Sequence, residues 1–216
     1  MIKGVSFDFD DVLYNLTKVN LKYIEDKYGV KLKPNEVNSW TYYHDNGFGS
    51  IIENVWNNPQ KYLESDLIEG AYEFYKEIEG IYGKDNIQII TASFPKIINV
   101  KDDYIKSIFN HDCNIIHTHD KHLYTKDTIL IDDSVNNIVK HIEHNNNPAI
   151  LFGLDYGWNS NFKEDNENLF RANSYEEALN IVNLFNQKGD KDEYNKKRWL
   201  YRIYEIIDKI FRRIYR

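Results

Sequence analysis

The chain has 216 residues, which is enough for one hydrophobic core and a modest insertion. Its 42% apolar and 28% charged residues are typical of a globular protein, and the single Cys113 excludes an internal disulfide. The sequence lacks the apolar segment of a signal peptide and any apolar run of about 18 residues, so we expect a cytosolic enzyme or binding protein without a membrane-spanning helix.

Charge is unevenly distributed along the chain. Residues 190–216 hold nine Lys/Arg and five Asp/Glu, a net charge of +4, and because the whole chain carries −7, residues 1–189 carry −11. An acidic body disfavours binding to a nucleic acid duplex, because like charges repel. We therefore expect no stable duplex partner, and any handling of phosphates requires bound cations or nearby lysines.

Short apolar runs rich in Ile and Val recur along the chain, each bounded by polar or turn residues. Continuous rather than alternating runs are typical of buried parallel strands. We expect these strands at residues 2–7, 87–91, 113–118, 128–132 and 148–153. Stretches that resemble helices lie between them, at residues 69–82, 101–110 and 134–145. This alternation predicts an α/β fold with a doubly wound parallel sheet.

Residues 14–68 separate the first two predicted strands and contain no convincing strand pattern. They include an amphipathic stretch at 16–29 and an aromatic-rich stretch at 39–56. We interpret the segment as a small helical cap, inserted after the first strand and beside its C-terminal end. The predicted catalytic core then comprises residues 1–13 and 69–189.

The end of the chain predicts two further helices. The first covers residues 174–185, and the second is a basic amphipathic helix at 193–216 within a separate segment, 190–216. This segment has three possible roles, namely packing on the acidic body, pairing with another subunit, or binding an anionic membrane. Glu205 and Asp208 interrupt the basic face, which favours packing or a homo-oligomer.

Polar and charged side chains follow four of the predicted strands, at the edge of such a sheet where ligands bind. These residues are Asp8, Asp10, Asp11, Thr91, Lys121, Asp132 and Asp133, and Ala92, directly after Thr91, offers its backbone N–H. Two acidic clusters on neighbouring strand ends repel each other unless a cation lies between them, and Mg²⁺ prefers such hard oxygen ligands. A carboxylate beside Mg²⁺ can act as a nucleophile, and a lysine with backbone N–H groups can stabilise a transferring phosphoryl group.

The order of these motifs resembles the haloacid dehalogenase-like phosphatases. Within that superfamily, residues 51–78, 120–134 and 150–159 resemble the 5'(3')-deoxyribonucleotidase family, and the resemblance covers roughly residues 2–185. It implies a Mg²⁺-dependent 5'-nucleotidase that hydrolyses (deoxy)ribonucleoside monophosphates to nucleoside and phosphate through an aspartyl-phosphate. The alternatives are a phosphatase for another small phosphomonoester or for a nucleic-acid 3'-phosphate end, and a binding protein that works through its basic tail.

The resemblance also implies roles for the catalytic residues. Asp8 would be the nucleophile, and Asp10 the general acid and then base, which also offers its backbone carbonyl to Mg²⁺. Thr91 and the N–H of Ala92 would hold the phosphate, and Lys121 would neutralise Asp8 and the phosphate.

Two further groups of residues complete the implied site. Asp132 and Asp133 would bind Mg²⁺ together with Asp8 and Asp10, one of the pair directly and the other through water. In the cap, the nucleobase would stack in the zone of three aromatic residues, Trp40, Tyr42 and Trp56. These aromatic side chains equally fit the core of a helical cap.

The chain departs from the family pattern at two positions. Asp11 stands where many relatives have glycine, and its carboxylate either points to solvent or alters the contact at the cap hinge. Ala92 stands where related enzymes often have serine, so one hydroxyl contact to phosphate is missing. Lys126 also competes with Lys121 for the role of the catalytic lysine, and we favour Lys121 because it follows the strand directly.

His117 and His119 alternate at the end of the third predicted strand, a spacing that predicts side chains on one face. Zinc binding is one interpretation, but no cysteine or third histidine stands at a typical spacing. We favour polar residues that line the mouth of a phosphatase site.

Overall fold

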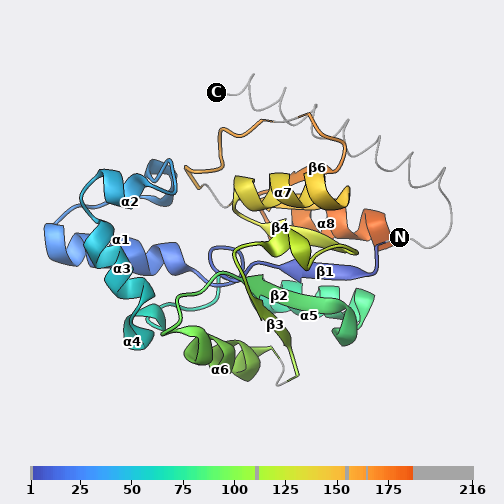
Figure 1. The fold of residues 1–216 in the computed structure, drawn as a ribbon, viewed down its shortest axis with the longest axis horizontal. Helices are drawn as coiled ribbons and strands as arrows, with labels where there is room; N and C mark the ends of the chain where they lie inside the picture. The colour runs from blue at the N-terminus through green and yellow to red at the C-terminus, as the bar shows by residue number, and fades with distance from the viewer. Residues whose placement is uncertain (1, 110–111, 154–155, 164, 187–216) are drawn as a thin grey trace.

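The computed structural model describes residues 2–109, 112–153, 156–163 and 165–186 (Figure 1). The predicted basic segment 190–216 lies outside the described residues, so its packing or pairing remains a prediction. Among the described helices, none has both the length and the apolar character needed to cross a membrane.

In the described part of the chain, six parallel strands form one sheet in the order β3-β2-β1-β4-β5-β6, which confirms the predicted fold class. The strands are β1 (Gly4–Phe7), β2 (Ile87–Thr91), β3 (Asn114–His117), β4 (Thr128–Asp132), β5 (Ala149–Phe152) and β6 (Leu169–Ala172). The first five match the predicted strands. The sequence analysis missed β6, because this edge strand has four residues, includes Arg171, and is only alternately buried.

The helices of the core connect these strands, and those of the predicted cap lie between β1 and β2. The core helices are α5 (Ala71–Tyr82), α6 (Ile98–Ile108), α7 (Val135–Asn145) and α8 (Tyr175–Asn186). The others are α1 (Leu16–Tyr28), α2 (Tyr42–Asp45), α3 (Gly49–Trp56) and α4 (Pro59–Tyr62). The described residues also include three short 3₁₀ turns, η1 (Pro34–Glu36), η2 (Lys84–Asn86) and η3 (Lys121–Leu123).

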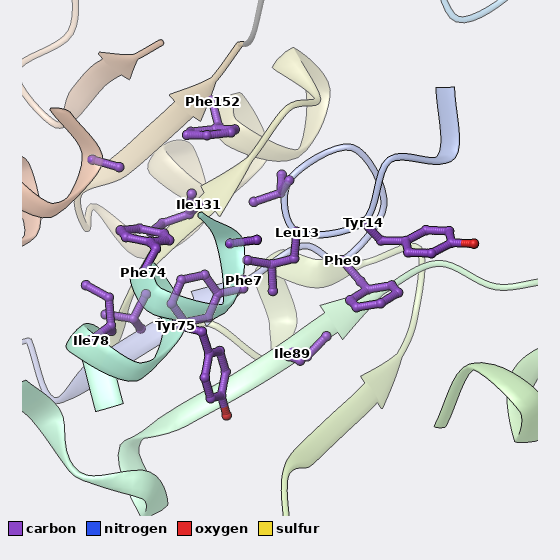
Figure 2. Close-up of a cluster of buried hydrophobic side chains, with 14 of the residues drawn as sticks. Phe7, Phe9, Leu13, Tyr14, Phe74, Tyr75, Ile78, Ile89, Ile131 and Phe152 are labelled. Carbon is purple, nitrogen blue, oxygen red and sulfur yellow. The ribbon is translucent and has the colours of Figure 1, made fainter. Parts of the chain in front are cut away.

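Helices cover both faces of the sheet, because buried apolar side chains lie on both of its faces. Along β4, Ile129 and Ile131 point into the core beneath α5 and α8, whereas Leu130 points to the opposite face beneath α7. Figure 2 shows the larger cluster, in which Phe7 from β1 lies among the side chains of α5. Its ring contacts Phe74 edge-on at 5.7 Å between ring centroids.

The helices α1 to α4 gather beyond the C-terminal ends of the strands (Figure 1). They share a small apolar cluster of their own, which includes Ile24, Val37 and Ile52. The two chain connections between these helices and the sheet lie side by side, since the N–H of Ile68 donates to the carbonyl of Leu13 at 2.8 Å. The arrangement agrees with a cap at 14–68, although its boundaries remain a prediction.

Asp11 begins this connection and is buried, which excludes the first of its two alternatives, a carboxylate that points to solvent. The carboxylate accepts hydrogen bonds from the N–H of Thr17 at 2.8 Å and from its hydroxyl at 2.9 Å, at the start of α1. Its backbone lies in the left-handed region, with φ of 58°. Asp tolerates this conformation through local hydrogen bonds, and glycine tolerates it because it has no Cβ. Asp11 therefore belongs to the cap hinge.

Candidate active site

Asp8, Lys121 and Asp132 meet at the C-terminal edge of the sheet, from the ends of β1 and β4 and from η3. The Nζ of Lys121 lies 2.8 Å from Asp8 Oδ1 and 2.7 Å from Asp132 Oδ2. All three side chains are buried, whereas Lys126 is exposed and has no such contact among the described residues. The structure thus brings Lys121, and not Lys126, to the acidic cluster.

Burial has the largest effect on the pKa of Asp8. It raises the pKa of Asp8 to about 7, against the lowering effect of Lys121 and with a further increase from Asp132. Burial acts on Lys121 in the opposite direction, but the charges of Asp132 and Asp8 outweigh it and raise the pKa of the lysine. Lys121 therefore stays charged, and the excess negative charge remains on the carboxylates.

Asp133 leaves one buried oxygen without a partner. Its Oδ2 accepts from Trp158 Nε1 at 2.9 Å, whereas its Oδ1 makes no hydrogen bond to any described residue. Asp132 is different, because its oxygens accept from Lys121, the N–H of Ser134 and Asn137 Nδ2. Burial, the charge of Asp132 and that of Asp8 raise the pKa of Asp133 well above its ordinary value.

The donor set fits a divalent cation. Ligand atoms of Asp8, Asp132 and Asp133 all lie within 4.8 Å of one another. Hard carboxylate oxygens suit Mg²⁺, and a cation there would satisfy Asp133 Oδ1 and offset the buried charge. Asp10 contributes no carboxylate oxygen to this group, since its side chain points elsewhere.

Asp10 is paired with Lys101, a residue that the sequence analysis did not identify. Lys101 lies on α6 and is fully buried, with its Nζ 2.6 Å from Asp10 Oδ2 and 2.6 Å from Thr91 Oγ1. It also lies 3.4 Å from the carbonyl of Ala92. In sequence, Lys101 begins the predicted helix at 101–110, and a lysine on a helix is normally solvated. Its only distinguishing signal is its place near the helix N-terminus, which faces the end of β2.

A cavity of about 620 Å³ opens above these groups, between the sheet edge and helices α1 to α4. This volume suits a small-molecule ligand. Asp8, Asp10, Lys121, Asp133 and Ala92 line one end, whereas Thr91 is buried behind it.

Two of the three predicted cap aromatics line this cavity. Trp40 and Trp56 do so, but Tyr42 does not, and its neighbour Tyr43 takes that place. Successive residues of a helix point about 100° apart, which agrees with this difference between the two tyrosines on α2. The cavity therefore gives no support to the predicted contact of Tyr42 with the substrate.

Two aromatic residues that the sequence analysis did not assign to the site, Phe94 and Trp158, also line the cavity. Together with Trp40, Tyr43 and Trp56 they form its aromatic wall. Phe94 follows β2 and stacks near Trp56, with ring centroids 6.1 Å apart and an interplanar angle of 28°. Trp158 lies 5.4 Å from Trp40, measured between ring centroids. Trp158 stands in the segment that carries the family resemblance, which was the one signal available for it.

Neutral polar groups stand beside the aromatic wall. Trp56 Nε1 donates to Asn20 Oδ1 at 3.2 Å, which leaves the amide N–H₂ of Asn20 as a donor. Tyr43 is buried beside Asn20 and presents a hydroxyl. One end of the cavity is therefore charged, and the other is aromatic with neutral donors.

The two histidines occupy different environments. His117 Nε2 lies 2.7 Å from Asp102 Oδ1, and His119 lines the cavity. Among the described residues, only the Asp8, Asp132 and Asp133 group has the spacing of metal ligands, so the zinc interpretation gains no support. The position of His119 agrees with a residue at the mouth of the site.

His141 supports the turn that carries Lys121. It lies buried on α7, with Nδ1 2.7 Å from Thr125 Oγ1, and Thr125 in turn donates to the carbonyl of Lys121. Burial lowers the pKa of His141 from 6.5 to about 4. Between these values the unfolded chain binds a proton that the folded chain does not. We therefore expect this side chain to reduce the unfolding free energy by about 3 kcal/mol as the pH falls through this range.

Urea unfolding near neutral pH and at mildly acidic pH measures this effect. His141→Gln keeps a polar side chain that does not titrate, so its unfolding free energy should depend less on pH than that of the wild type. An identical pH dependence in the two proteins would contradict the assignment to His141.

The parallel sheet and its acidic edge resemble those of the haloacid dehalogenase-like hydrolases. The fold resembles that of a haloacid dehalogenase-like family hydrolase from Xanthomonas campestris, with a TM-score of 0.53 and 14% identity, over 84% of this chain and 95% of that chain. It also resembles a predicted phosphoglycolate phosphatase from Haemophilus somnus, with a TM-score of 0.51 and 16% identity over 84% and 98% of the two chains. A magnesium-bound hydrolase from Bacillus subtilis gives a TM-score of 0.52 and 11% identity over 84% and 99%.

The sequence assigns the family more narrowly. Residues 1–188 match the model of the family described as 5' nucleotidase, deoxy (pyrimidine), cytosolic type C. The chain belongs to this family, and it is a phosphomonoester hydrolase. A search of curated proteins finds no match.

Proposed function

We propose that this protein is a Mg²⁺-dependent 5'-nucleotidase that hydrolyses (deoxy)ribonucleoside monophosphates to nucleoside and phosphate. The observation that carries the proposal is a single cavity with a carboxylate–lysine cluster at one end and an aromatic wall at the other. A nucleoside monophosphate has the same division between a charged phosphate and an aromatic base. Membership in the 5'-nucleotidase family supports this substrate class.

In the first step, a carboxylate oxygen of Asp8 attacks phosphorus, and the bond from phosphorus to the nucleoside oxygen breaks. Asp10 gives its proton to that oxygen, and an aspartyl-phosphate forms on Asp8. In the second step, Asp10 takes a proton from water, whose oxygen attacks phosphorus and releases phosphate and free Asp8. Lys121 and the N–H of Ala92 stabilise the phosphoryl oxygens, and Thr91 acts with Lys101 behind them.

Mg²⁺ would supply positive charge against the phosphoryl oxygens and the nucleophile. Asp8, Asp133 and the backbone carbonyl of Asp10 would hold it. Asp132, whose oxygens already accept several hydrogen bonds, would bind through water. The magnesium-bound relative from Bacillus subtilis is consistent with this choice of metal.

Phosphate release from dUMP, dTMP, dGMP and AMP, with Mg²⁺ and with EDTA, tests this function. We expect turnover of at least one nucleotide, lost on chelation, and a higher melting temperature with Mg²⁺, because a ligand that binds only the folded state stabilises it. Turnover of sugar phosphates without turnover of any nucleotide would favour the alternative, a phosphatase for another small phosphomonoester. The acidic body disfavours nucleic-acid ends as substrates.

Trp56 should contribute to binding of the base rather than to chemistry. We expect Trp56→Ala to raise KM for a nucleotide about 10-fold with a smaller change in kcat, since stacking on an aromatic ring contributes about 1–3 kcal/mol. Tyr42→Ala is the matched control, because it removes a cap aromatic that does not line the cavity. Equal KM values for the two variants would contradict the role of Trp56.

We also propose that the protein is located in the cytosol and that it forms a homo-oligomer through residues 190–216. The description of the family as cytosolic is consistent with the first. Removal of residues 190–216, followed by measurement of molar mass in solution and of phosphatase activity, tests the second. Loss of an oligomer with retained activity is the expected result.

A further inference from the structure

Asp10 is held from two sides, by the sheet domain and by the cap helices. Lys101 of α6 contacts its Oδ2, and Tyr62 of α4 donates its hydroxyl hydrogen to its Oδ1 at 2.5 Å. Both Asp10 and Tyr62 line the cavity. A carboxylate with a different partner on each oxygen has one preferred orientation, and loss of either partner frees it to rotate.

Tyr62 is itself fixed in place. Its side chain is fully buried, and its ring stacks on Tyr14 at 5.2 Å between centroids, with 28° between the planes. The hydroxyl of Tyr14 donates to the backbone carbonyl of Tyr62. Tyr14 stacks in turn on Phe9, at 5.3 Å and 8°, and these two rings lie side by side in Figure 2. The rings thus link α4 to the loop between Asp8 and Asp10.

The phenol of Tyr62 stays a hydrogen-bond donor. Its hydroxyl lies 2.5 Å from Asp10 Oδ1 as a donor, and an ordinary phenol keeps its proton at neutral pH. An oxygen of Asp10 that accepts this hydrogen bond still has a second lone pair for the proton that goes to the leaving group.

We propose that Tyr62 is a positioning residue for the acid–base step, which orients Asp10 towards the leaving oxygen only while α4 is docked on the sheet edge. The inference rests on the proposed function, since it assigns proton transfer to Asp10. Tyr62 makes no bond to the reacting atoms and acts through Asp10. The hydrogen bond between Tyr62 and Asp10 thereby couples the position of the cap to the orientation of the general acid.

Two substrates with different leaving groups distinguish this role from a structural one. An alkyl phosphate such as dUMP needs a proton on its leaving oxygen, whereas p-nitrophenolate leaves without one. We expect Tyr62→Phe to lower kcat/KM for dUMP about 10-fold, part of the usual contribution of a general acid, and to leave kcat/KM for p-nitrophenyl phosphate within about 2-fold. The ratio of the two constants is the measurement.

Tyr14→Phe is the matched control. It removes a hydroxyl from the same ring stack and loosens the same turn, but it does not touch Asp10. We expect Tyr14→Phe to change kcat/KM for dUMP and for p-nitrophenyl phosphate by the same factor. An unchanged ratio in Tyr62→Phe, or the same change of ratio in Tyr14→Phe, would overturn the proposal.

A double variant provides a second measurement. Asp10→Asn has no acid left to orient, so adding Tyr62→Phe should cause no further loss with dUMP, and additive losses would count against the coupling. If the wild type hydrolyses p-nitrophenyl phosphate but no nucleotide, the proposed substrate is wrong. The role of Tyr62 is then measured with whichever alkyl phosphate is turned over, so the two failures are distinguishable.

Discussion

Asp8→Asn is expected to abolish turnover while the protein stays folded. An amide oxygen is a poor nucleophile, and loss of a nucleophile costs about 10⁴-fold or more in kcat. Residual activity close to that of the wild type, in a well-folded variant, would refute the assignment of Asp8. Aspartyl-phosphate formation is also testable by mass spectrometry after a rapid acid quench, and only the wild type should show it.

The same substitution should stabilise the metal-free protein. Burial raises the pKa of Asp8 from 3.8 to about 7, so between these values the folded chain binds a proton that the unfolded chain does not. A carboxyl group of this kind loses stability as the pH rises through that window. Asn carries no such cost, and we expect Asp8→Asn to gain about 1–3 kcal/mol near pH 8 without Mg²⁺.

Added Mg²⁺ provides the control for this stability change. The wild type should gain more unfolding free energy from Mg²⁺ than Asp8→Asn does, because the variant lacks one anionic ligand. Urea unfolding of both proteins with Mg²⁺ and with EDTA measures the difference. A variant that is less stable than the wild type in EDTA would show that the charge of Asp8 is already well compensated by Lys121.

Lys101→Met is expected to lower turnover about 100-fold, because it removes the cation that holds both Asp10 and Thr91. Met nearly matches the length of the lysine stem, so little packing is lost. The carboxylate of Asp10 loses its ion pair but keeps Tyr62 and partial contact with solvent, so we expect a stability loss of only about 1–2 kcal/mol.

Asp10→Asn tests the pair from the other side. It leaves the fully buried ammonium of Lys101 without a counter-charge, and breaking a buried pair in this way costs about 3–5 kcal/mol. The double variant that combines Asp10→Asn with Lys101→Met should therefore be more stable than Asp10→Asn alone. If Lys101→Met instead has normal turnover, Lys101 serves the packing of α6 and not the site.

The sequence predicted the residues that follow the strands, and the physical reason is topological. Parallel strands end at one edge of their sheet, so the order of apolar runs is enough to bring Asp8, Lys121 and Asp132 together. It also predicted the helical segment between the first two strands, because 14–68 has no strand pattern. The edge strand β6 was missed, since a short strand with a charged residue lacks the apolar signal.

The direction in which side chains point could not be predicted from chain order. Tyr42 and Tyr43 are neighbours of the same type, and only the rotation of α2 shows that Tyr43 faces the cavity. Asp11 was an open position in the sequence, and it is explained by the local backbone at the hinge and its bonds to Thr17.

By itself, the sequence determined the fold class, the sheet edge at which the candidate site lies, and most of the residues that stand there. Only the tertiary structure showed that Lys101 and Tyr62 hold Asp10, and that Asp133 has an unpartnered oxygen. Apolar periodicity reports which segments are buried. Contacts between distant polar groups depend on how helices dock, and neither lysine nor tyrosine carries a local pattern that distinguishes a buried partner from a solvated side chain.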